Sequence, residues 1–487
     1  MKESRPQSVP SRLFPLYALL WVTALVCLFS LIGIFTRPPE LLAAFWPANA
    51  VLLGIMLRYP RLASPAGWLG GIAGYLIAAL FTDDSAIKTA LLTLGNLAGV
   101  GVGYLLFRRL DHEDIRLRRP TSIVYLLLIT IAASLAAGLV GAFINPVLFS
   151  GDILYGLGFW FASELVNYMA ILPVILALPS LAVMTRWRTD FYRPDISWSK
   201  LLPLLSFLAT LLLALLIEGP GSIVFPVPAL LWCAVSYSLF STTLLSLCFS
   251  TLTLIALSSG YLTINHDAQT QYWMFSVRIG LMLIALTPLT AASIMAARNA
   301  LLSKMEYLAH HDHLTGALNR TGFWPQAQTM LAHQALRQQS VAVCMLDLDN
   351  FKRINDNHGH EAGDALLKAF SDTVRQHLRK GDLFARLGGE EFVVLLPATT
   401  RPQALEVVER LREQVAALSV RDEDQQGVSA TVSIGIICQQ GGPYSLDRLL
   451  SGADKALYQA KRNGRNRVEQ HPDDEQDNPV PTRPLSL

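Results

Sequence analysis

The stretch Arg386-Leu387-Gly388-Gly389-Glu390-Glu391-Phe392 sets two adjacent carboxylates at a glycine turn. Mostly apolar runs flank the turn at 383–387 and 392–396, and they predict a β-hairpin. Glycine allows a positive φ and a close approach of the backbone to a ligand, and two consecutive glutamates cannot both be buried without a cation. The turn is therefore either a metal site at a sheet edge or a solvated hairpin tip, and the motif alone favours the tip.

The composition divides the chain into two parts. Of its 487 residues, 52% are hydrophobic and only 16% are charged, which excludes an ordinary soluble enzyme. Apolar runs of roughly 18 to 25 residues, the length that crosses a bilayer core, recur over 14–297 and stop after Arg298. We therefore expect an N-terminal all-α polytopic membrane domain at 14–297 behind a short cytoplasmic segment at 1–13. The net charge of +2 gives no sign of nucleic acid, and no such partner is expected.

About ten helices are expected in the membrane domain. The candidate spans are 14–36, 41–58, 64–81, 87–107, 122–147, 155–184, 200–217, 222–239, 241–261 and 273–297. Lys and Arg gather in alternate loops, and the positive-inside rule then puts both termini in the cytoplasm and requires an even number of crossings. Ten satisfies the rule, and eight would also satisfy it if 221–261 is re-entrant. The first span lacks a small-residue cleavage site and is expected to be retained.

Strands and helices alternate after the last span. The expected order is strand 341–346, helix 361–378, strands 383–386 and 392–396, helix 402–418, strand 430–438 and helix 446–462. This order predicts one α/β domain with a central sheet at 312–470. A helical stalk at 298–311 is expected before it, although a helix packed on its own domain fits equally well. The tail at 471–487 is expected to be disordered.

Candidate ligands for a nucleotide follow the first strand of this domain. Asp347 comes at the end of a buried strand, where α/β folds bind ligands. A Mg²⁺ ion on a triphosphate takes one or two protein carboxylates, and Asp347 with Glu390 would supply them. Lys352 is placed to contact phosphate, and Lys461 and Arg465 form a second basic cluster.

Two residues on either side of a tight turn are candidates for reading a base. Asn355 and Asp364 flank His358-Gly359-His360, and an amide carbonyl and a carboxylate could read the N1, N2 and O6 edge of guanine, which offers two donors and an acceptor. Either residue alone is explained equally well as a helix cap or a surface charge.

Five motifs in order resemble the GGDEF family of bacterial diguanylate cyclases. They lie at 312–320, 347–356, 359–364, 386–392 and 460–466, and the match covers about residues 305–470. Glu390 stands where the family name has Asp and keeps the carboxylate. Ala317 stands where Leu is common, and no functional effect is expected from it.

The resemblance implies an adenylyl cyclase and polymerase palm-like fold and a homodimer that condenses two GTP into cyclic di-GMP and two pyrophosphates. Two Mg²⁺ ions per half-site, or Mn²⁺ in their place, would bind Asp347, the Leu348 carbonyl, Glu390 and Glu391. The catalytic residues would be Glu390, Glu391 and Lys352. The substrate would contact Phe351, Asn355, Asp364, Lys461 and Arg465.

The resemblance also implies feedback by the product. Arg379 and Asp382 match the RxxD site at which cyclic di-GMP inhibits such cyclases, and an ordinary surface ion pair is the alternative. A catalytically inactive membrane sensor that binds GTP or cyclic di-GMP is the competing function. A transporter with a nucleotide-binding domain is a third hypothesis, but the spans show no internal repeat.

Residues 14–297 resemble a multi-span membrane-associated sensor domain often fused to such cyclases, through span count, order and the segment at 45–50. This implies a multi-pass protein of the bacterial inner membrane, in contact with the lipid bilayer, that responds to an unknown ligand or protein. Glu164, Asn167 and Arg278 are the sensor candidates, because ionisable groups inside a bilayer are costly and often functional. Glu164 and Arg278 are expected to form an ion pair or to line a ligand cavity.

Overall fold

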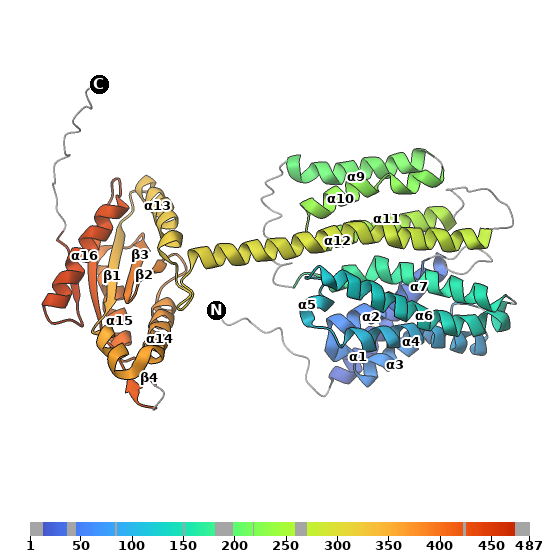
Figure 1. The fold of residues 1–487 in the computed structure, drawn as a ribbon, viewed down its shortest axis with the longest axis horizontal. Helices are drawn as coiled ribbons and strands as arrows, with labels where there is room; N and C mark the ends of the chain where they lie inside the picture. Colours follow the sequence, from blue (N-terminus) through green and yellow to red (C-terminus); the bar gives the residue numbers. More distant parts are fainter. Residues whose placement is uncertain are drawn as a thin grey trace, which may run out of the picture. The chain divides into compact units, whose positions relative to one another are not determined.

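The chain is divided into two compact units in the computed structural model, Met1–Ala300 and Leu301–Leu487 (Figure 1). The structure describes residues 13–36, 45–82, 85–149, 151–180, 198–217, 219–258, 270–421 and 425–472. The predicted cytoplasmic N-terminus and nearly all of the predicted disordered tail therefore fall outside the described residues.

The first unit is helical. Its helices are α1 (Phe14–Phe35), α2 (Ala48–Arg58), α3 (Pro65–Ala79), α4 (Ala86–Phe107), α5 (His112–Ile115), α6 (Thr121–Phe149), α7 (Ile153–Leu176), α9 (Trp198–Leu216), α10 (Val227–Ser236), α11 (Leu239–Ser258) and the first part of α12 (Thr270–His310). Short 3₁₀ turns occur at Pro60–Leu62 and Pro220–Val224.

The number of membrane crossings differs from the predicted ten. Within the described residues seven helices are long and apolar enough to cross a bilayer, namely α1, α4, α6, α7, α9, α11 and α12. Three shorter apolar helices, Ala48–Arg58, Pro65–Ala79 and Gly221–Ser236, coincide with the other predicted spans. An apolar helix therefore occurs at each predicted position, but ten crossings are not confirmed.

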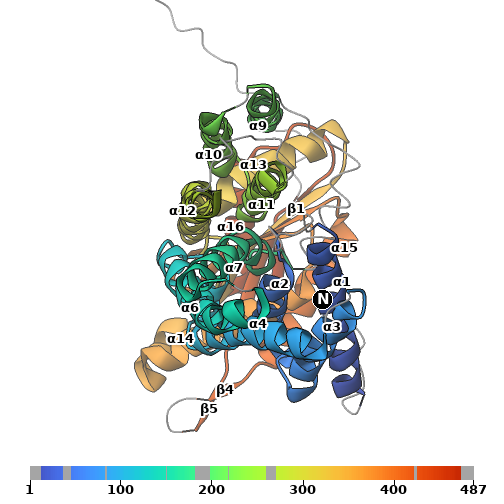
Figure 2. The same ribbon diagram turned by 90° about the vertical axis from the view of Figure 1, so that its right-hand side faces the viewer.

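The short helix α2 lies inside the bundle. Its residues from Ala48 to Leu57 are all buried, and it packs against α1, α4 and α7 (Figure 2). Glycines allow the close approach: a Cβ atom on Gly54 would lie 2.8 Å from Ile175 Cδ1. A helix that is buried on all sides belongs to the interior, so the polar side chain of Asn49 must find its partners there.

The second unit is built on a five-stranded sheet in the order β2-β3-β1-β6-β7. The strands are β1 (Val341–Leu348), β2 (Leu383–Gly388), β3 (Glu391–Pro397), β6 (Val432–Gln439) and β7 (Val468–Gln470). Strand β1 is antiparallel to both β3 and β6, and all eight of its residues are buried. The pair β4 (Val420–Arg421) and β5 (Gly427–Val428) forms a separate small hairpin.

Helices cover both faces of this sheet (Figure 1). On one face α14 (Phe351–His377) and α15 (Arg401–Ala416) pack on alternate residues of β1 such as Cys344 and Leu346. On the other face α13 (Arg320–Leu336) and α16 (Leu446–Arg462) pack on Val343 and Met345. A central sheet between two helical layers confirms the predicted α/β class.

Two helical details differ from the expected order. Helix α13 was not expected at all, and α14 begins at Phe351 rather than at residue 361. Gly359 interrupts α14 with φ 81° and ψ 163°, so two helical segments meet at a kink there. A glycine turn thus joins two helices where the sequence suggested a loop before one helix.

Candidate active site

The hairpin turn and the end of the central strand lie together. Asp347 is the second-last residue of β1, and it lies opposite Glu391 of β3 in the antiparallel register. The N–H of Leu348 donates to the carbonyl of Glu390 over 3.4 Å. Gly389 takes φ +50°, a left-handed conformation that glycine adopts without strain. The four residues predicted to bind metal are therefore neighbours in the fold.

Asp347 is the most enclosed of the three carboxylates. Its side chain is 8% exposed, whereas Glu390 is half-buried and Glu391 is exposed. Burial raises the pKa of Asp347; the hydrogen bond and charge of Lys461 oppose this rise, and the charges of Glu390 and Glu391 add to it. The Lys461 ammonium lies 2.7 Å from Asp347 Oδ2. The carboxylate that was predicted to bind metal thus has a cation as its partner.

Magnesium fits this set of donors. The ion prefers oxygen, takes one or two protein carboxylates and leaves its remaining positions to phosphate and water. Among the residues that the structure describes, no three His, Cys, Asp or Glu side chains are arranged to enclose an ion. A site with few protein ligands agrees with an ion that arrives bound to a nucleotide. The contact with the Lys461 ammonium shows that Asp347 is positioned to accept a positive charge.

The predicted base-reading residues come from the two halves of α14. Asn355 precedes the kink at Gly359, and Asp364 follows it on an exposed face. The two halves touch here, because a Cβ atom on Gly363 would lie only 1.8 Å from Asn355 Oδ1. Asn355 Oδ1 is buried and has no hydrogen-bond partner among the described residues. The amide oxygen is therefore available to a ligand.

The other substrate candidates differ in burial. Phe351 is buried and packs in the core under α14, whereas Lys352 and Arg465 are exposed. Lys461 is only partly exposed, because it reaches Asp347 from the last turn of α16. Phe351 can therefore shape a pocket wall, and the exposed basic residues are free to contact a triphosphate.

Asp349 is a residue of the site to which the sequence analysis gave no role. It is 4% exposed and accepts hydrogen bonds from Ser433 Oγ at 2.6 Å and Thr431 Oγ1 at 2.6 Å. The N–H of Asn466 also donates to it, at 3.0 Å. Asn466 and Arg465 both have positive φ, at +44° and +64°. Asp349 thus ties the loop that carries Arg465 to the end of β1, and the second carboxylate of the Asp-Leu-Asp run was the available signal.

Arg379 and Asp382 form an ion pair at the other end of the β2–β3 hairpin. Arg379 Nε and the Arg379 backbone N–H each donate to the Asp382 carboxylate at 3.0 Å. Arg379 Nη2 donates to Thr399 Oγ1 at 2.6 Å and to the carbonyl of Pro397. Because Asp382 immediately precedes β2 while Gly389 lies in the turn between β2 and β3, this pair is separate from the metal-site residues.

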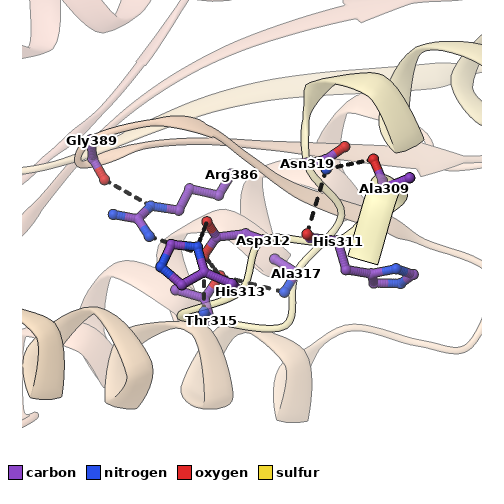
Figure 3. A network of polar contacts seen from close by, with 9 residues as sticks. All are labelled: Ala309, His311, Asp312, His313, Thr315, Ala317, Asn319, Arg386 and Gly389. Atoms are coloured by element: carbon purple, nitrogen blue, oxygen red, sulfur yellow. Dashed lines mark hydrogen bonds and ion pairs between the residues drawn. The ribbon is translucent and has the colours of Figure 1, made fainter. Parts of the chain in front are cut away.

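A second polar network joins the turn of the hairpin to the end of α12. Arg386 Nη1 donates to Asp312 Oδ1 at 2.9 Å and Arg386 Nε donates to the carbonyl of Gly389 at 2.9 Å (Figure 3). Thr315 donates to the same Asp312 oxygen through its N–H at 2.9 Å and its hydroxyl at 2.7 Å. Burial acts to raise the pKa of Asp312, but the hydrogen bonds from Thr315 and Arg386 outweigh it and lower this pKa.

This network begins two residues after the helix that comes from the membrane unit. Asn319 Nδ2 donates to the carbonyl of Ala309 at 2.8 Å and to that of His311 at 3.4 Å (Figure 3). Asp312 and Arg386 both lie in motifs that the sequence analysis quoted, but no role was predicted for either. Their ion pair connects the residues after α12 with the turn that carries Glu390.

The sensor candidates of the first unit do not form the predicted ion pair. Glu164 Oε1 accepts from Asn49 Nδ2 at 2.7 Å, while Arg278 donates to Ser163 Oγ and lies 4.4 Å from the centre of the Phe159 ring. Ser163 and Glu164 are consecutive on α7, so their side chains leave the helix in different directions. The expected Glu164–Arg278 ion pair is therefore not formed; of the alternative, a place in a cavity wall, the structure bears out Glu164 but not Arg278.

The polar cluster in this unit is centred on Asn49, which the sequence analysis missed. The Tyr75 hydroxyl donates to Asn49 Oδ1 at 2.6 Å, and Trp46 Nε1 donates to the same oxygen at 3.3 Å. Asn49 Nδ2 donates to Asn96 Oδ1 at 3.1 Å as well as to Glu164. Asn167 lies beside this cluster and accepts from the N–H of Trp46 at 3.2 Å. The quoted segment at 45–50 contained the signal, but its Asn was not recognised as a partner for a buried acid.

Comparison with known proteins assigns the two parts of the chain separately. The family model described as diguanylate cyclase, GGDEF domain, matches residues 309–467, and the MASE1 model matches residues 15–299. The probable diguanylate cyclase DgcF of Escherichia coli O157:H7 is 29% identical over 92% of this chain and 93% of its own. DgcF of Escherichia coli strain K12 is 30% identical over 63% of this chain and 96% of its own. The crystal structure of the GGDEF domain of DgcB from Caulobacter crescentus in complex with c-di-GMP has 29% identity, covers 34% of this chain and 96% of its own, and gives a TM-score of 0.32.

Proposed function

Because the chain belongs to the GGDEF family of diguanylate cyclases and carries a MASE1 membrane sensor domain, we propose that it condenses two GTP into cyclic di-GMP and two pyrophosphates. The observation that carries this proposal is the meeting of Asp347, Glu390 and Glu391 at the end of β1 and the β2–β3 turn. The charges of Glu390 and Glu391 raise the pKa of Asp347, and a cation that GTP brings with it would offset this repulsion.

The residues of the turn have separate roles in this proposal. Asp347, the Leu348 carbonyl and Glu390 would hold Mg²⁺, and Glu391 would add a ligand or accept the proton of the 3′ hydroxyl. The bound ions supply positive charge that activates the hydroxyl and stabilises the leaving pyrophosphate. Lys352 and Arg465 would neutralise the phosphates. Lys461, which now pairs with Asp347, would turn to the triphosphate, since a lysine ammonium on its flexible chain readily changes partners.

The base would bind along α14. Guanine would donate to Asn355 Oδ1, which has no partner among the described residues, and to the exposed carboxylate of Asp364. Phe351 would form the wall of the purine pocket. Because residue 363 is glycine, the Asn355 amide has room beside it. Any side chain at position 363 would displace the Asn355 amide.

The reaction requires two chains. One GTP per chain provides one 3′ hydroxyl and one α-phosphorus, and the ring closes only if each hydroxyl attacks the other nucleotide. A homodimer through the cyclase units would therefore be the active form, and a membrane unit that controls the meeting of two chains would control the rate. We place the protein in the bacterial inner membrane with its N-terminus and its cyclase unit in the cytoplasm. The seven long apolar helices in the described residues support a multi-pass protein, and the even number of crossings that this orientation requires would be reached if one or all three of the shorter apolar helices also cross.

Product inhibition would use Arg379 and Asp382. Cyclic di-GMP offers phosphate and the guanine edge, which a guanidinium can bind with two hydrogen bonds. The Arg379 guanidinium donates hydrogen bonds to Asp382, Thr399 and Pro397. Cyclic di-GMP would have to replace some of these hydrogen bonds in order to bind. The site is distant along the hairpin from the carboxylates, as a regulatory site would be.

A direct assay tests the proposed reaction. The purified full chain is incubated with Mg²⁺ and GTP, and cyclic di-GMP and pyrophosphate are measured beside the variant Glu391→Gln. We expect the parent to form both products and the variant to lose about a hundredfold or more of the rate, because it loses a proton acceptor or metal ligand. A parent that binds GTP but forms no cyclic di-GMP under conditions that support dimers would instead support the inactive sensor.

A further inference from the structure

A cavity of about 150 Å³ lies within the helical bundle of the first unit. It is bounded by the ends of α1 and α3 and by the beginnings of α2, α4 and α7, so it lies near one end of these helices. Four aromatic side chains line it: Trp46, Tyr75, Phe159 and Trp160. A cavity of this size accommodates a ligand of about six heavy atoms, comparable to benzene.

Glu164 is the charged residue in the wall of this cavity. It is 5% exposed, and its Oε2 atom has no hydrogen-bond partner among the described residues. The Asn49 amide cannot supply one, because its two N–H groups already donate to Glu164 Oε1 and to Asn96. An unpaired carboxylate oxygen in a water-poor interior requires a donor from elsewhere.

The lining determines which ligand charge is acceptable. Arg278 does not line the cavity: its guanidinium is held behind Phe159 and Ser163. Glu164 therefore opposes an anion, and no cationic side chain in the described wall offsets it. Aromatic faces attract cations through their π electrons, and a carboxylate beside several aromatic rings is the environment that stabilises a desolvated ammonium group.

We propose that this cavity binds a small organic cation of the alkylammonium class, whose N–H group donates to Glu164 Oε2 and whose alkyl groups lie against the aromatic rings. The unpaired carboxylate oxygen matches a ligand with one N–H donor, such as a tertiary ammonium ion, and the other unpartnered wall atoms, Ser30 Oγ and Trp160 Nε1, are uncharged. Under the predicted topology, the cavity lies towards the side of the membrane that faces away from the cytoplasm, because α1 ends there and Ser30 and Ile34 near its end line the cavity.

The cavity shares two wall residues with the contact that holds α12. Phe159 and Ser163 line the cavity and also bind Arg278, which is 2% exposed. Helix α12 continues from Arg278 without interruption to His310, two residues before Asp312. A ligand that presses on Phe159 and Ser163 changes how Arg278 is held, and α12 is the element through which such a change reaches the cyclase unit. This regulatory step rests on the proposed function, whereas binding to the cavity does not.

Binding is tested on the purified full chain in lipid nanodiscs by titration with trimethylammonium chloride, followed by calorimetry and by the fluorescence of the tryptophans. tert-Butanol, which has a similar size and no charge, is the matched probe. We expect saturable binding of trimethylammonium and binding of tert-butanol at least about tenfold weaker, since the charge interacts with both Glu164 and the rings. Equal binding of the two probes, or no saturable binding of trimethylammonium, would overturn the proposal.

Three variants locate the binding. Glu164→Gln should weaken trimethylammonium at least about tenfold while leaving tert-butanol unchanged. Ala79→Leu fills the cavity without touching the polar cluster and should abolish binding of both, which keeps the test valid if Glu164→Gln fails to fold. Glu113→Gln, on an exposed ion pair with Arg118, is the matched control and should bind like the parent. A Glu164→Gln protein that is folded and binds trimethylammonium normally would contradict the assignment.

The same preparation separates this inference from the proposed function. Cyclic di-GMP formation is measured with and without saturating trimethylammonium. Binding without any synthesis of cyclic di-GMP would leave the cavity assignment intact and remove the proposed reaction. Synthesis of cyclic di-GMP without binding of trimethylammonium would support the proposed reaction and remove the cavity assignment. If trimethylammonium binds and synthesis changes by about twofold or more only in proteins with an intact Glu164, the cavity and the cyclase are coupled.

Discussion

The two units hold their carboxylates in different ways. Glu164 lies inside the first unit, where Asn49 gathers four side-chain partners around it. Glu390 and Glu391 lie at a hairpin tip in the second unit and are open to a ligand. Asp347 is intermediate, because it is buried like Glu164 but is held by the movable ammonium of Lys461. The polar side chains of the Asn49 cluster are thus paired with each other, whereas Glu390 and Glu391 of the cyclase site are accessible to a substrate.

The surrounding solvent explains this difference. A bilayer offers no hydrogen bonds, so each polar group that a membrane helix carries must find a partner within the protein. Glu164 Oε2 departs from that rule, as do Trp160 Nε1 and Tyr168 Oη, but among the buried atoms that the structure describes it is the one carboxylate oxygen without a partner, and it lies in a cavity wall. At the hairpin tip, water can satisfy unpaired oxygens until a metal and a nucleotide replace it. An unpaired group therefore means more in the first unit than in the second.

The largest effect that we predict is on the stability of the bundle. Asn49→Leu removes four hydrogen bonds and leaves Glu164, Tyr75 and Asn96 without that partner. At roughly 0.6 kcal/mol for each bond in a membrane protein, with an added cost for the mismatched shape, we expect a loss of about 3 kcal/mol. The measurement is thermal or denaturant unfolding of the full chain in detergent, followed by helical circular dichroism.

A neighbouring asparagine provides the control for this prediction. Asn167→Leu removes the hydrogen bond to the Trp46 N–H and one bond within its own helix, to the Ser163 carbonyl. It should cost about 1 kcal/mol. Equal losses in the two variants would mean that Asn49 is not the centre of the cluster, and the contrast between the units would weaken.

The next effect distinguishes two aspartates that are two residues apart. Asp349→Asn places an amide where Ser433 and Thr431 donate hydrogen bonds, and it should destabilise the second unit by about 2 kcal/mol. Asp347→Asn should change the free energy of unfolding by less than about 0.5 kcal/mol, because the lost attraction to the partly exposed Lys461 ammonium is offset by the removal of a buried charge. Activity should fall in both. The comparison is made by urea unfolding beside the GTP assay, and a stable, inactive Asp349→Asn would show that Asp349 is a ligand and not a support.

The elements of the cyclase unit could be predicted because local patterns determine them. The hairpin at 383–396 and the strand at 341–346 have apolar residues on both faces, which identifies strands buried between two helical layers. The kink at Gly359 could not be predicted in the same way, since both halves of α14 are helical and the glycine only redirects the chain. Family motifs, and not periodicity, identified the residues at the turn.

The contacts of the bundle could not be predicted from the sequence, for a different reason. Position along a span shows that Glu164 and Arg278 are both buried, but not which helix faces each side chain. The structure puts Asn49, from a helix too short for a simple span, between α4 and α7. The opposite charges of Glu164 and Arg278 suggested an ion pair. In the structure α7 is oriented so that Ser163 accepts from Arg278, while Glu164 accepts from the Asn49 amide.

The last effect concerns the ion pair that we assign to product inhibition. Arg379 is 57% exposed but the Asp382 side chain is only 4% exposed, so Arg379→Ala leaves a buried carboxylate with the backbone N–H of residue 379 as a donor and should cost about 1 kcal/mol. The same change should remove inhibition by added cyclic di-GMP, because the guanidinium is the group that would bind the product. Initial rates of pyrophosphate release are measured over a range of product concentrations, with Arg375→Ala on the preceding helix as a control of equal charge. If Arg379→Ala were inhibited as strongly as the parent, Arg379 would not bind the product. Its hydrogen bonds to Thr399 and Pro397 would then serve only to stabilise this end of the hairpin.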